Sequence, residues 1–359
     1  MSSKGKVLVA MSGGVDSSVA AALLSEQGYE VIGLTMRLAD ALPAEDRGPR
    51  SCCSVEDVGD ARTVADRLGI PFYAGYYKDA FQKHVIDYFV ESYKKGLTPN
   101  PCAKCNEHLK FDLLIQRADE LGCDFLATGH YARIDRSGEK PALLRGLDSD
   151  KDQSYFLFTM SEAALERTLF PVGELPKNEV RALADRFELP VASKPDSQEI
   201  CFIPDAGYVP FVEERIGEAN PGKFVDTSGN VIGEHRGIHA YTIGQRRGLG
   251  LGGMSEPHFV IRIDADRNEV VVGPASELHA PAIQVGIAAL ASGLPPEFDA
   301  QVQIRYRHEP VPAHITLSES GKALVRFEEP EQAATPGQAA VFYDGERVLG
   351  GGWIEEVLP

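Results

Sequence analysis

The segment Ser12-Gly13-Gly14-Val15-Asp16-Ser17-Ser18 has the residue types of a phosphate-binding loop. Glycine lets a backbone approach phosphate closely, and hydroxyls and the amides at a helix N-terminus donate hydrogen bonds to it. Asp16 would repel a phosphate, so we expect it to hold Mg²⁺ or to orient the loop. The Gly-Lys-Ser/Thr ending of a Walker A loop is absent from this motif. The structural alternative is a Ser/Gly turn that caps a helix.

This loop resembles the SGGxDS pyrophosphate loop of the N-type ATP pyrophosphatases. The resemblance implies that ATP adenylates an oxygen of the substrate and that pyrophosphate leaves. On this motif alone, amidotransferase-type synthetases and tRNA-modifying enzymes both stay open.

Two cysteines follow a pair of prolines in Thr98-Pro99-Asn100-Pro101-Cys102-Ala103-Lys104-Cys105-Asn106. We predict that a helix begins near Cys105, where the helix dipole and Lys104 would lower the pKa of the thiol and favour the thiolate. Cys-x-x-Cys is also typical of a redox pair or of half a zinc site. A four-thiolate zinc site would need a second pair with similar spacing, which the adjacent Cys52-Cys53 does not supply.

A third motif, Asp196-Ser197-Gln198-Glu199-Ile200-Cys201-Phe202-Ile203, places a cysteine among apolar residues. Such a cysteine by itself is typical of a buried hydrophobic position. Beside an ATP-adenylating loop and Cys105, it supplies the second of two separated thiols that sulfur transfer would require.

The elements that must position these motifs alternate between strand and helix over the first 200 residues. We predict strands at 7–10, 31–34, 70–73 and 125–127, and helices at 17–27, 55–68, 78–95 and 105–121. This alternation indicates an α/β fold with a doubly wound, mostly parallel sheet, whose ligands lie past the carboxyl ends of the strands. The glycine-rich loop, Met36 and residues 128–130 lie at such ends.

From about residue 208 the chain is rich in Gly and Pro, and its strands are short. Strands at 283–289, 301–306, 323–327 and 339–343, after a Pro-rich joint at 279–281, predict a small antiparallel barrel. We therefore predict an ATP-binding catalytic domain at 1–205, a small central β-rich domain at 206–280 and a C-terminal β-barrel at 281–359.

The chain of 359 residues has a formal net charge of −17, and each of the three predicted domains is negative. This balance argues against indiscriminate binding to bulk nucleic acid or to an anionic membrane. No stretch approaches the roughly 18 apolar residues of a membrane span, and no signal-like cleavage site follows the N-terminal apolar run. We expect a cytoplasmic protein, in which six cysteines indicate catalysis, redox chemistry or metal binding.

Along its whole length the sequence is similar to the tRNA-specific 2-thiouridylase family. The blocks that carry this resemblance are residues 11–18, 98–101, 105–106, 127–131, 144–148, 151–156, 170–173, 200–203, 242–250, 335–338 and 349–352.

The resemblance implies a reaction in two stages on uridine 34 of tRNA. ATP adenylates the 2-oxygen and releases pyrophosphate, and a cysteine persulfide then attacks C2 and releases AMP. The resemblance assigns the persulfide to Cys201 and the role of nucleophile to Cys105, and the two thiols can close a disulfide. It also implies that a sulfur-carrier protein recharges the enzyme, which we expect to be a monomer.

The resemblance also implies two sets of binding residues. The ATP contacts would be Ala10, Met11, Ser12, Gly13, Gly14, Val15, Asp16, Ser17, Met36 and Gly129. The tRNA contacts would be Asn100, Pro101, Cys102, His130, Lys151, Asp152, Gln153, Arg305, Tyr306 and Gln338. Strand alternation predicts that Arg305 and Arg307 lie on the same side of one strand.

At Cys102 the sequence departs from some family members, which carry an Asp that has been viewed as an acid/base group. Because the pKa values of a thiol and a carboxyl differ by several units, the role of Cys102 stays open. Cys102, Cys105 and Cys201 could instead ligate a [4Fe–4S] cluster with one open iron. Persulfide chemistry is the preferred hypothesis and the cluster is the alternative.

Two other functions stay open at this point. Another pyrophosphate-loop ATP ligase, acting on a small molecule, would need neither Cys105 nor Cys201. An RNA-binding protein whose loop only senses nucleotide would release no pyrophosphate in response to tRNA.

Overall fold

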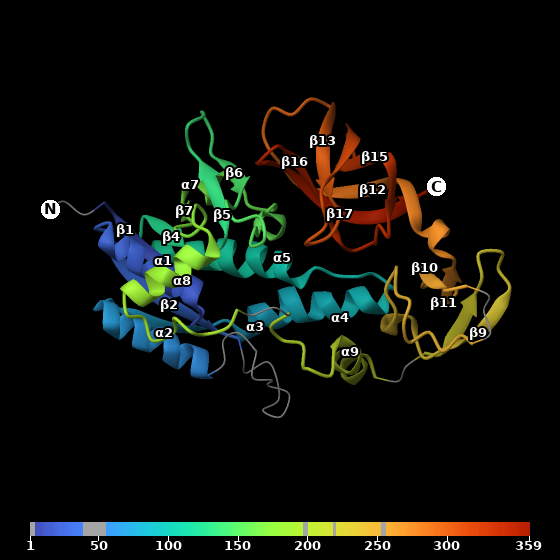
Figure 1. Cartoon of the computed structure of the whole chain (residues 1–359), viewed down its shortest axis with the longest axis horizontal. Helices are drawn as coiled ribbons and strands as arrows, with labels where there is room; N and C mark the ends of the chain where they lie inside the picture. The colour runs from blue at the N-terminus through green and yellow to red at the C-terminus, as the bar shows by residue number, and fades with distance from the viewer. Residues whose placement is uncertain (1–3, 39–54, 197–199, 218–219, 253–255) are drawn as a thin grey trace. The chain divides into compact units, whose positions relative to one another are not determined.

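The computed structural model describes residues 4–38, 55–196, 200–217, 220–252 and 256–359 (Figure 1). The chain forms two compact units. The first contains residues 1–85, 102–205 and 346–348, and the second contains residues 86–101, 206–345 and 349–359.

A five-stranded parallel sheet forms the centre of the first unit, with strand order β3-β2-β1-β4-β7. Its strands are β1 (Lys6–Ala10), β2 (Glu30–Arg37), β3 (Phe72–Tyr76), β4 (Phe125–Ala127) and β7 (Thr168–Leu169). The predicted strand at 70–73 begins two residues later in the structure, after Pro71, which has no amide hydrogen to donate to a neighbouring strand.

Helices cover both faces of this sheet. Alternate residues of β1 point to opposite faces, and Val7 and Val9 share a core with α1 (Val15–Glu26), α2 (Val55–Leu68) and α8 (Lys177–Arg186). Leu8 is fully buried outside that core, and α6 (Leu114–Glu120) packs on β1 and β4. The predicted doubly wound α/β fold is therefore confirmed for this part of the chain.

Each of the two long helices predicted before β4 contains a π-helical stretch. The first consists of α3 (Lys78–Phe81), η3 (Gln82–Ile86) and α4 (Asp87–Lys94), and the second of α5 (Pro101–Cys105), η4 (Asn106–Leu113) and α6. The second helix begins at Pro101 and not near Cys105, because proline suits the first position of a helix. Cys102, and not Cys105, therefore lies in the first turn, and the predicted position of Cys105 at a helix N-terminus is wrong.

The first unit contains a few further short elements. They are the hairpin of β5 (Ala132–Asp135) and β6 (Ala142–Arg145), the turn η5 (Ser154–Phe156) and α7 (Glu162–Glu166).

A small four-stranded sheet with the order β10-β11-β8-β9 lies in the second unit. Its elements and their neighbours are α9 (Tyr208–Ile216), β8 (Gly222–Val225), β9 (Val231–His235), η6 (Ile238–Ala240), β10 (Phe259–Asp264), β11 (Glu269–Gly273) and η7 (Ala275–Leu278). Phe224, Val260 and Val270 are fully buried in its core.

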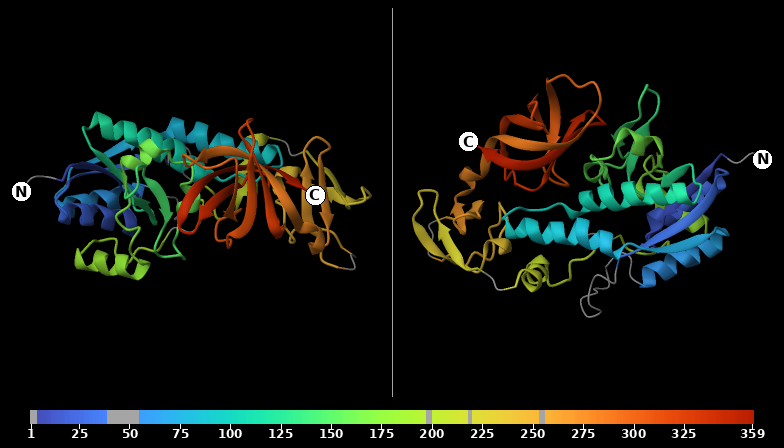
Figure 2. Two further views of the ribbon diagram at one scale, coloured as in Figure 1. Left: turned by 90° about the horizontal axis from the view of Figure 1, so that it is seen from above. Right: turned by 180° about the vertical axis from the view of Figure 1, so that it is seen from behind.

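A closed barrel of six strands, counted within the described residues, forms the C-terminal part of this unit (Figure 2). The strand order is β12-β15-β14-β13-β16-β17, and the pairing of β12 with β17 closes it. The strands are β12 (His279–Leu290), β13 (Glu297–Gln303), β14 (Val311–Leu317), β15 (Lys322–Gln332), β16 (Ala339–Asp344) and β17 (Arg347–Leu358). The predicted C-terminal β-barrel is confirmed.

Two predictions about this region are wrong. The Pro-rich joint at 279–281 belongs to β12, because the pairing with β15 shifts register between Ala280 and Ala282 and so tolerates Pro281. Arg305 and Arg307 do not share a strand face, since β13 ends at Gln303 and residues 305–307 form a turn in which Arg307 has a φ of +62°.

The boundaries 1–205, 206–280 and 281–359 stay our proposal for the domains. Within the described residues, no helix combines the length and the apolar composition that crossing a membrane requires.

Close backbone contact at Gly352 makes barrel closure testable. A Cβ at this position would lie 2.0 Å from the carbonyl oxygen of Gly286 on β12. We expect Gly352→Ala to destabilise the barrel by about 1–3 kcal/mol, as overpacking typically does. The fluorescence of Trp353, the only tryptophan of the chain, should report this as a lower urea midpoint.

Gly59→Ala is the matched control, because a Cβ there meets no atom within 4 Å and lies in the interior of α2. Alanine favours a helix over glycine by about 1 kcal/mol, so this variant should not lower the Trp353 midpoint. An unchanged midpoint for Gly352→Ala would contradict the observed closure.

Candidate nucleotide site and cysteines

The glycine-rich loop lies where the order of the parallel strands reverses. β1 is central, with β2 and β3 on one side and β4 and β7 on the other. The loop follows β1, and residues 128–130 follow β4. Ligands of open α/β sheets bind in the crevice at this point.

Hydrogen bonds within the chain preform the loop. The hydroxyl of Ser17 accepts from the amide of Ser12 at 3.1 Å, and the hydroxyl of Ser18 donates to the carbonyl of Gly14 at 2.7 Å. Thr35, next to Met36 on β2, donates to the carbonyl of Met11 at 2.6 Å. The predicted contacts from Ala10 to Ser17 are thus held together in one turn between β1 and α1.

Two glycines allow close backbone approach at this loop. Gly13 has a φ of +75°, and a Cβ there would lie 2.2 Å from the carbonyl oxygen of Asp57 in α2. A Cβ at Gly129 would lie 2.5 Å from the amide nitrogen of Ser17. The end of β4 therefore rests directly on the first turn of α1, which brings Gly129 to the loop as the sequence predicts.

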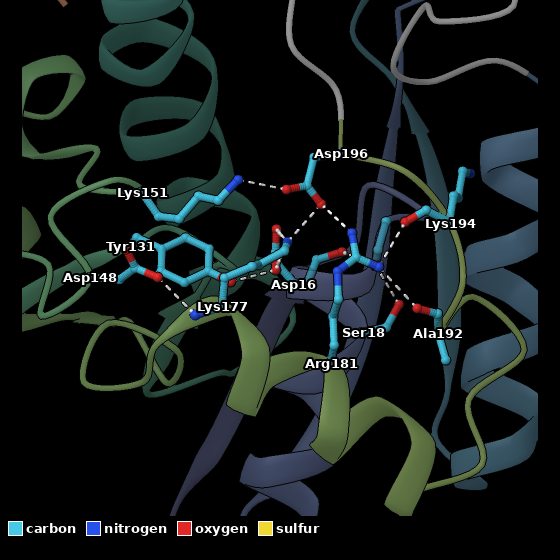
Figure 3. Close-up of polar contacts among 12 residues, drawn as sticks. Asp16, Ser18, Tyr131, Asp148, Lys151, Lys177, Arg181, Ala192, Lys194 and Asp196 are labelled. Carbon is cyan, nitrogen blue, oxygen red and sulfur yellow. Dashed lines mark hydrogen bonds and ion pairs between the residues drawn. The ribbon is translucent and has the colours of Figure 1, made fainter. Parts of the chain in front are cut away.

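Lys177 and Tyr131 hold Asp16 (Figure 3). The ammonium of Lys177 donates to both carboxylate oxygens of Asp16 at 2.7 and 2.9 Å, and the hydroxyl of Tyr131 donates at 2.8 Å. Burial, together with the negative charge of Asp16, raises the pKa of Tyr131, so its hydroxyl stays a donor. Of the two roles expected for Asp16, the orientation of the loop is the one that these contacts display.

Asp196 gathers three cations beside this contact (Figure 3). Its carboxylate accepts from Lys151 at 2.8 Å and from Arg181 at 2.8 Å, and it lies 2.8 Å from the ammonium of Lys177. Burial opposes ionisation, but the hydrogen bonds and charges of Lys151 and Lys177 outweigh it and lower the pKa of Asp196 to about 2. Asp196 thus stays ionised and fixes Lys177 between two carboxylates.

Lys194 forms a second bridge, from the loop to α2. Its ammonium donates to the carbonyl of Gly13 at 3.1 Å and to Asp57 and Asp60 at 2.6 Å each. Burial opposes the charge of Lys194, but its hydrogen bonds to the two carboxylates raise its pKa. The glycine-rich loop is therefore held on both sides by buried or half-buried ion pairs.

Asp152 and Gln153, which the resemblance assigns to tRNA, make internal contacts. The two oxygens of Asp152 accept from Arg145 and from the amides of Gly146 and Ser154 at 2.9–3.0 Å. The side-chain oxygen of Gln153 accepts from the amide of Tyr131 at 3.0 Å. These two side chains therefore shape the segment that presents Lys151, and their contact with tRNA stays a prediction.

His130 is nine-tenths buried at the end of β4. Its Nε2 lies 3.2 Å from the ammonium of Lys110, and its Nδ1 lies 2.7 Å from the hydroxyl of Thr128. An ammonium can only donate, so Nε2 accepts and Nδ1 carries the proton of a neutral ring. Burial, together with the charge of Lys110, holds the pKa of His130 well below its usual value.

Cys102, Cys105 and Cys201 are partly exposed, whereas Cys123 is buried. A buried neighbour anchors each of the two predicted catalytic cysteines. Next to Cys105, Asn106 donates to the carbonyl of Phe156 at 3.0 Å; next to Cys201, the ring of Phe202 packs edge-on against Phe81 at 5.7 Å. Residues 197–199 of the third motif, and Cys52 and Cys53, lie outside the described residues.

Within the described residues, which include Cys102, Cys105 and Cys201, no three His, Cys, Asp or Glu side chains come together as metal ligands. The cluster alternative needs three converging thiolates, and the observed arrangement does not fit it. Mg²⁺ needs fewer protein ligands, since one or two carboxylates and the phosphates of a nucleotide usually hold it. The carboxylate of Asp16 at the loop fits that requirement.

The remaining predicted tRNA contacts lie in the second unit. The side-chain amide of Gln338 donates to the carbonyls of Thr98 and Pro99 at 3.2 Å each, and so supports the segment that ends in Asn100 and Pro101. Asn100 and Pro101 are buried, and Arg305 and Tyr306 lie in the turn after β13. Contact of these residues with tRNA stays a prediction.

The sequence analysis did not identify Lys177, Tyr131, Lys194 or Lys110 as site residues. One local signal could have pointed to Lys177: it is the first residue of α8, where the helix dipole disfavours a cation. A positive charge at such an end needs a compensating partner, which Asp16 and Asp196 provide. The other three contacts join distant parts of the chain and leave no local pattern.

Comparison with known proteins agrees with this architecture. The family described as "tRNA methyl transferase HUP domain" matches residues 5–205. Two more family descriptions follow, "tRNA methyl transferase PRC-barrel domain" at residues 210–274 and "Aminomethyltransferase beta-barrel domain" at residues 287–354.

Curated relatives match over nearly the full chain. A protein of Geobacter metallireducens named tRNA-specific 2-thiouridylase MnmA is 51% identical over 362 residues, which cover 98% of this chain and 97% of the relative. The protein of the same name from Carboxydothermus hydrogenoformans is 50% identical over 98% of both chains. The chain belongs to the tRNA-specific 2-thiouridylase family.

Likeness to solved structures is weaker. A 4-thiouridine synthetase–RNA complex with bound ATP has a TM-score of 0.35 and 18% identity over 59% of this chain and 53% of that chain. The membership of the family rests on the sequence matches.

The state of His130 gives a testable prediction. Long-range ¹H–¹⁵N NMR spectra should show His130 as the neutral Nδ1–H tautomer at pH 8 and still at the usual histidine pKa of about 6.5. Because burial opposes protonation of His130 in the folded state, the contribution of neutral His130 to the free energy of unfolding is fully present above about pH 6.5. This contribution is lost as the pH falls toward the lowered pKa of His130.

The matched variant is His130→Asn, which cannot titrate. Its free energy of unfolding should fall less between pH 7 and 5.5 than that of the unmodified chain, by at most about 1.4 kcal/mol per pH unit. Titration of His130 near pH 6.5, or equal slopes for the two proteins, would contradict the buried Lys110 contact.

Proposed function

We propose that this chain catalyses the ATP-dependent 2-thiolation of uridine 34 in tRNA. The observation that carries the proposal is a preformed phosphate loop in the same compact unit as two cysteines that are far apart in the sequence, Cys105 and Cys201. Membership of the tRNA-specific 2-thiouridylase family supports the tRNA substrate and the 2-thiouridine product.

The first stage makes a leaving group at C2. The 2-oxygen of the uridine attacks the α-phosphorus of ATP, a P–O bond breaks, and pyrophosphate leaves. The backbone amides at the N-terminus of α1 would donate to the departing phosphates, and the internal hydrogen bonds of Ser12, Ser17 and Ser18 hold the loop in shape for them. Mg²⁺, held by Asp16 and the nucleotide, would neutralise the charge that develops on pyrophosphate.

The second stage transfers sulfur. The terminal sulfur of a persulfide on Cys201 attacks C2, and the C2–O bond breaks to release AMP. The thiolate of Cys105 then attacks the inner sulfur of Cys201, so that the S–S bond to the transferred sulfur breaks. The transferred sulfur is reduced to the thiocarbonyl, the two cysteines are oxidised to a disulfide, and a thiol reductant restores them.

The partners follow from this chemistry. A sulfur-carrier protein supplies the persulfide, and tRNA supplies the uridine. The negative net charge means that tRNA is held by a few placed cations rather than by a general field, so the salt dependence of binding should be shallow. Lys151 and Arg305 are the cations expected to make such contacts.

Removal of single cysteines separates the two stages. Cys105→Ser and Cys201→Ser should each abolish 2-thiouridine, measured by nucleoside mass analysis after incubation with tRNA, ATP, Mg²⁺ and a persulfide donor. Adenylation precedes sulfur attack, so both variants should still release pyrophosphate once per enzyme when tRNA is present. Cys123→Ala is the control: burial raises the pKa of the Cys123 thiol, which makes it unreactive, and product formation should persist.

Three results would contradict the proposal. Full thiolation by either serine variant would show that sulfur transfer does not require both cysteines. Turnover of a small molecule without tRNA would favour the other class of ATP ligase. Stoichiometric iron with an absorbance band near 400 nm, required for activity, would favour the [4Fe–4S] alternative over the persulfide.

A further inference from the structure

A lysine reaches the nucleotide side of the sheet without a carboxylate partner. Lys110 lies on η4, and its ammonium donates to Nε2 of His130 at 3.2 Å. No carboxylate of the described residues forms an ion pair with Lys110, and none contributes to the electrostatics of His130. The local charge at Lys110 is therefore uncompensated within the part of the chain that the structure describes.

Four other half-buried lysines of the first unit differ in this respect. Lys104 pairs with Glu107 at 2.9 Å, and Lys151, Lys177 and Lys194 each pair with at least one aspartate. In a chain with a net charge of −17, carboxylates are abundant. A half-buried ammonium next to a neutral imidazole, with no carboxylate, therefore indicates that an anion from outside the chain completes the site.

His130 fixes the direction of this ammonium. Its ring is buried, its Nδ1 side is taken by Thr128 at 2.7 Å, and its Nε2 accepts one proton of Lys110. An ammonium carries three donors, so two are left for a ligand. Both ring nitrogens of His130 are thereby engaged, which leaves Lys110 as the group that can offer hydrogen bonds outward.

The π-helix determines which side of the helix Lys110 occupies. In η4 (Asn106–Leu113) the backbone bonds run from residue i to residue i+5, so each turn holds more residues and Lys110 is rotated less far from the side of Cys105 than it would be in an α-helix. In a regular α-helix, five residues would carry Lys110 well past that side. The π-helical stretch therefore brings Lys110 nearer to the side of the predicted nucleophile.

We propose that Lys110 binds a phosphate group of the reacting complex and that neutral His130 positions its ammonium for that contact. The proposal rests on the proposed function and deepens it, because it adds Lys110 to the binding residues and gives His130 a supporting role. The phosphate comes from the tRNA backbone or from the nucleotide, and the two sources are separated by experiment.

The first measurement is binding of tRNA without nucleotide, by the unmodified chain and by Lys110→Gln, at several salt concentrations. If the phosphate belongs to the tRNA, Lys110→Gln should weaken binding severalfold and reduce the slope of log K against log salt by about 1. The second measurement is binding of ATP with Mg²⁺ in the absence of tRNA. A severalfold loss of affinity that Lys110→Gln shows for ATP but not for tRNA assigns the phosphate to the nucleotide.

Two control variants test whether the loss of binding is specific to the cation at position 110. Lys140→Gln removes the same charge from an exposed lysine that pairs with Glu162, and it should change neither binding constant nor the salt slope. Lys110→Arg keeps the cation and should retain most of the affinity. Thermal unfolding of each variant shows whether it is folded.

Substitution of His130 tests the positioning role. His130→Ala should weaken the same binding arm as Lys110→Gln, and the double variant should lose no more than Lys110→Gln alone. Additive losses would mean that His130 contacts the ligand independently and would overturn its supporting role. A structural defect alone would not change the salt slope.

The failure of this inference can be told from the failure of the proposed function. If folded Lys110→Gln binds both tRNA and ATP like the unmodified chain, Lys110 is no phosphate ligand, while 2-thiouridine formation is unaffected. If the unmodified chain forms no 2-thiouridine and binds no tRNA, the proposed function itself fails.

Discussion

An ammonium between two carboxylates joins the beginning and the end of the α/β unit. Lys177, the first residue of α8, contacts Asp16 in the first turn of α1 and Asp196 beyond α8 (Figure 3). The residues of the first contact are 161 positions apart. Because the cation stands at a helix end that disfavours it, both carboxylates are needed, and the loop between β1 and α1 acquires one fixed orientation. The proposed adenylation depends on that loop.

The same electrostatic logic explains how a strongly negative chain can act on a nucleic acid. Several cations near the loop are neutralised internally, as Lys177 and Arg181 are by Asp196, so they create little general attraction to phosphate. Lys110 is different, since its described partner is a neutral imidazole. Affinity in such a protein would come from a few cations in defined places, which favours a folded RNA over bulk nucleic acid.

Local patterns predicted the elements but not the contacts between them. The bounds of α2 and β4 follow from apolar periodicity and from the glycines that end the helices, and the structure has them as predicted. The predicted helix start near Cys105 is wrong, because proline prefers the first helical position and the helix begins at Pro101. The turn at 305–307 was misread as a strand, since an alternating sequence does not reveal the positive φ of Arg307. The partners of Lys177 and Lys110 are set by tertiary structure alone.

The central claim is that this fixed loop activates the 2-oxygen of a uridine in tRNA. It is tested most directly with a tRNA that carries ¹⁸O at C2 of uridine 34, incubated with the enzyme, ATP, Mg²⁺ and a persulfide donor. Adenylation of that oxygen, followed by attack of sulfur at C2, predicts one ¹⁸O atom in the AMP for each 2-thiouridine formed. Formation of 2-thiouridine with unlabelled AMP would contradict the account, because the C2 oxygen would then have left by a path that does not involve the nucleotide.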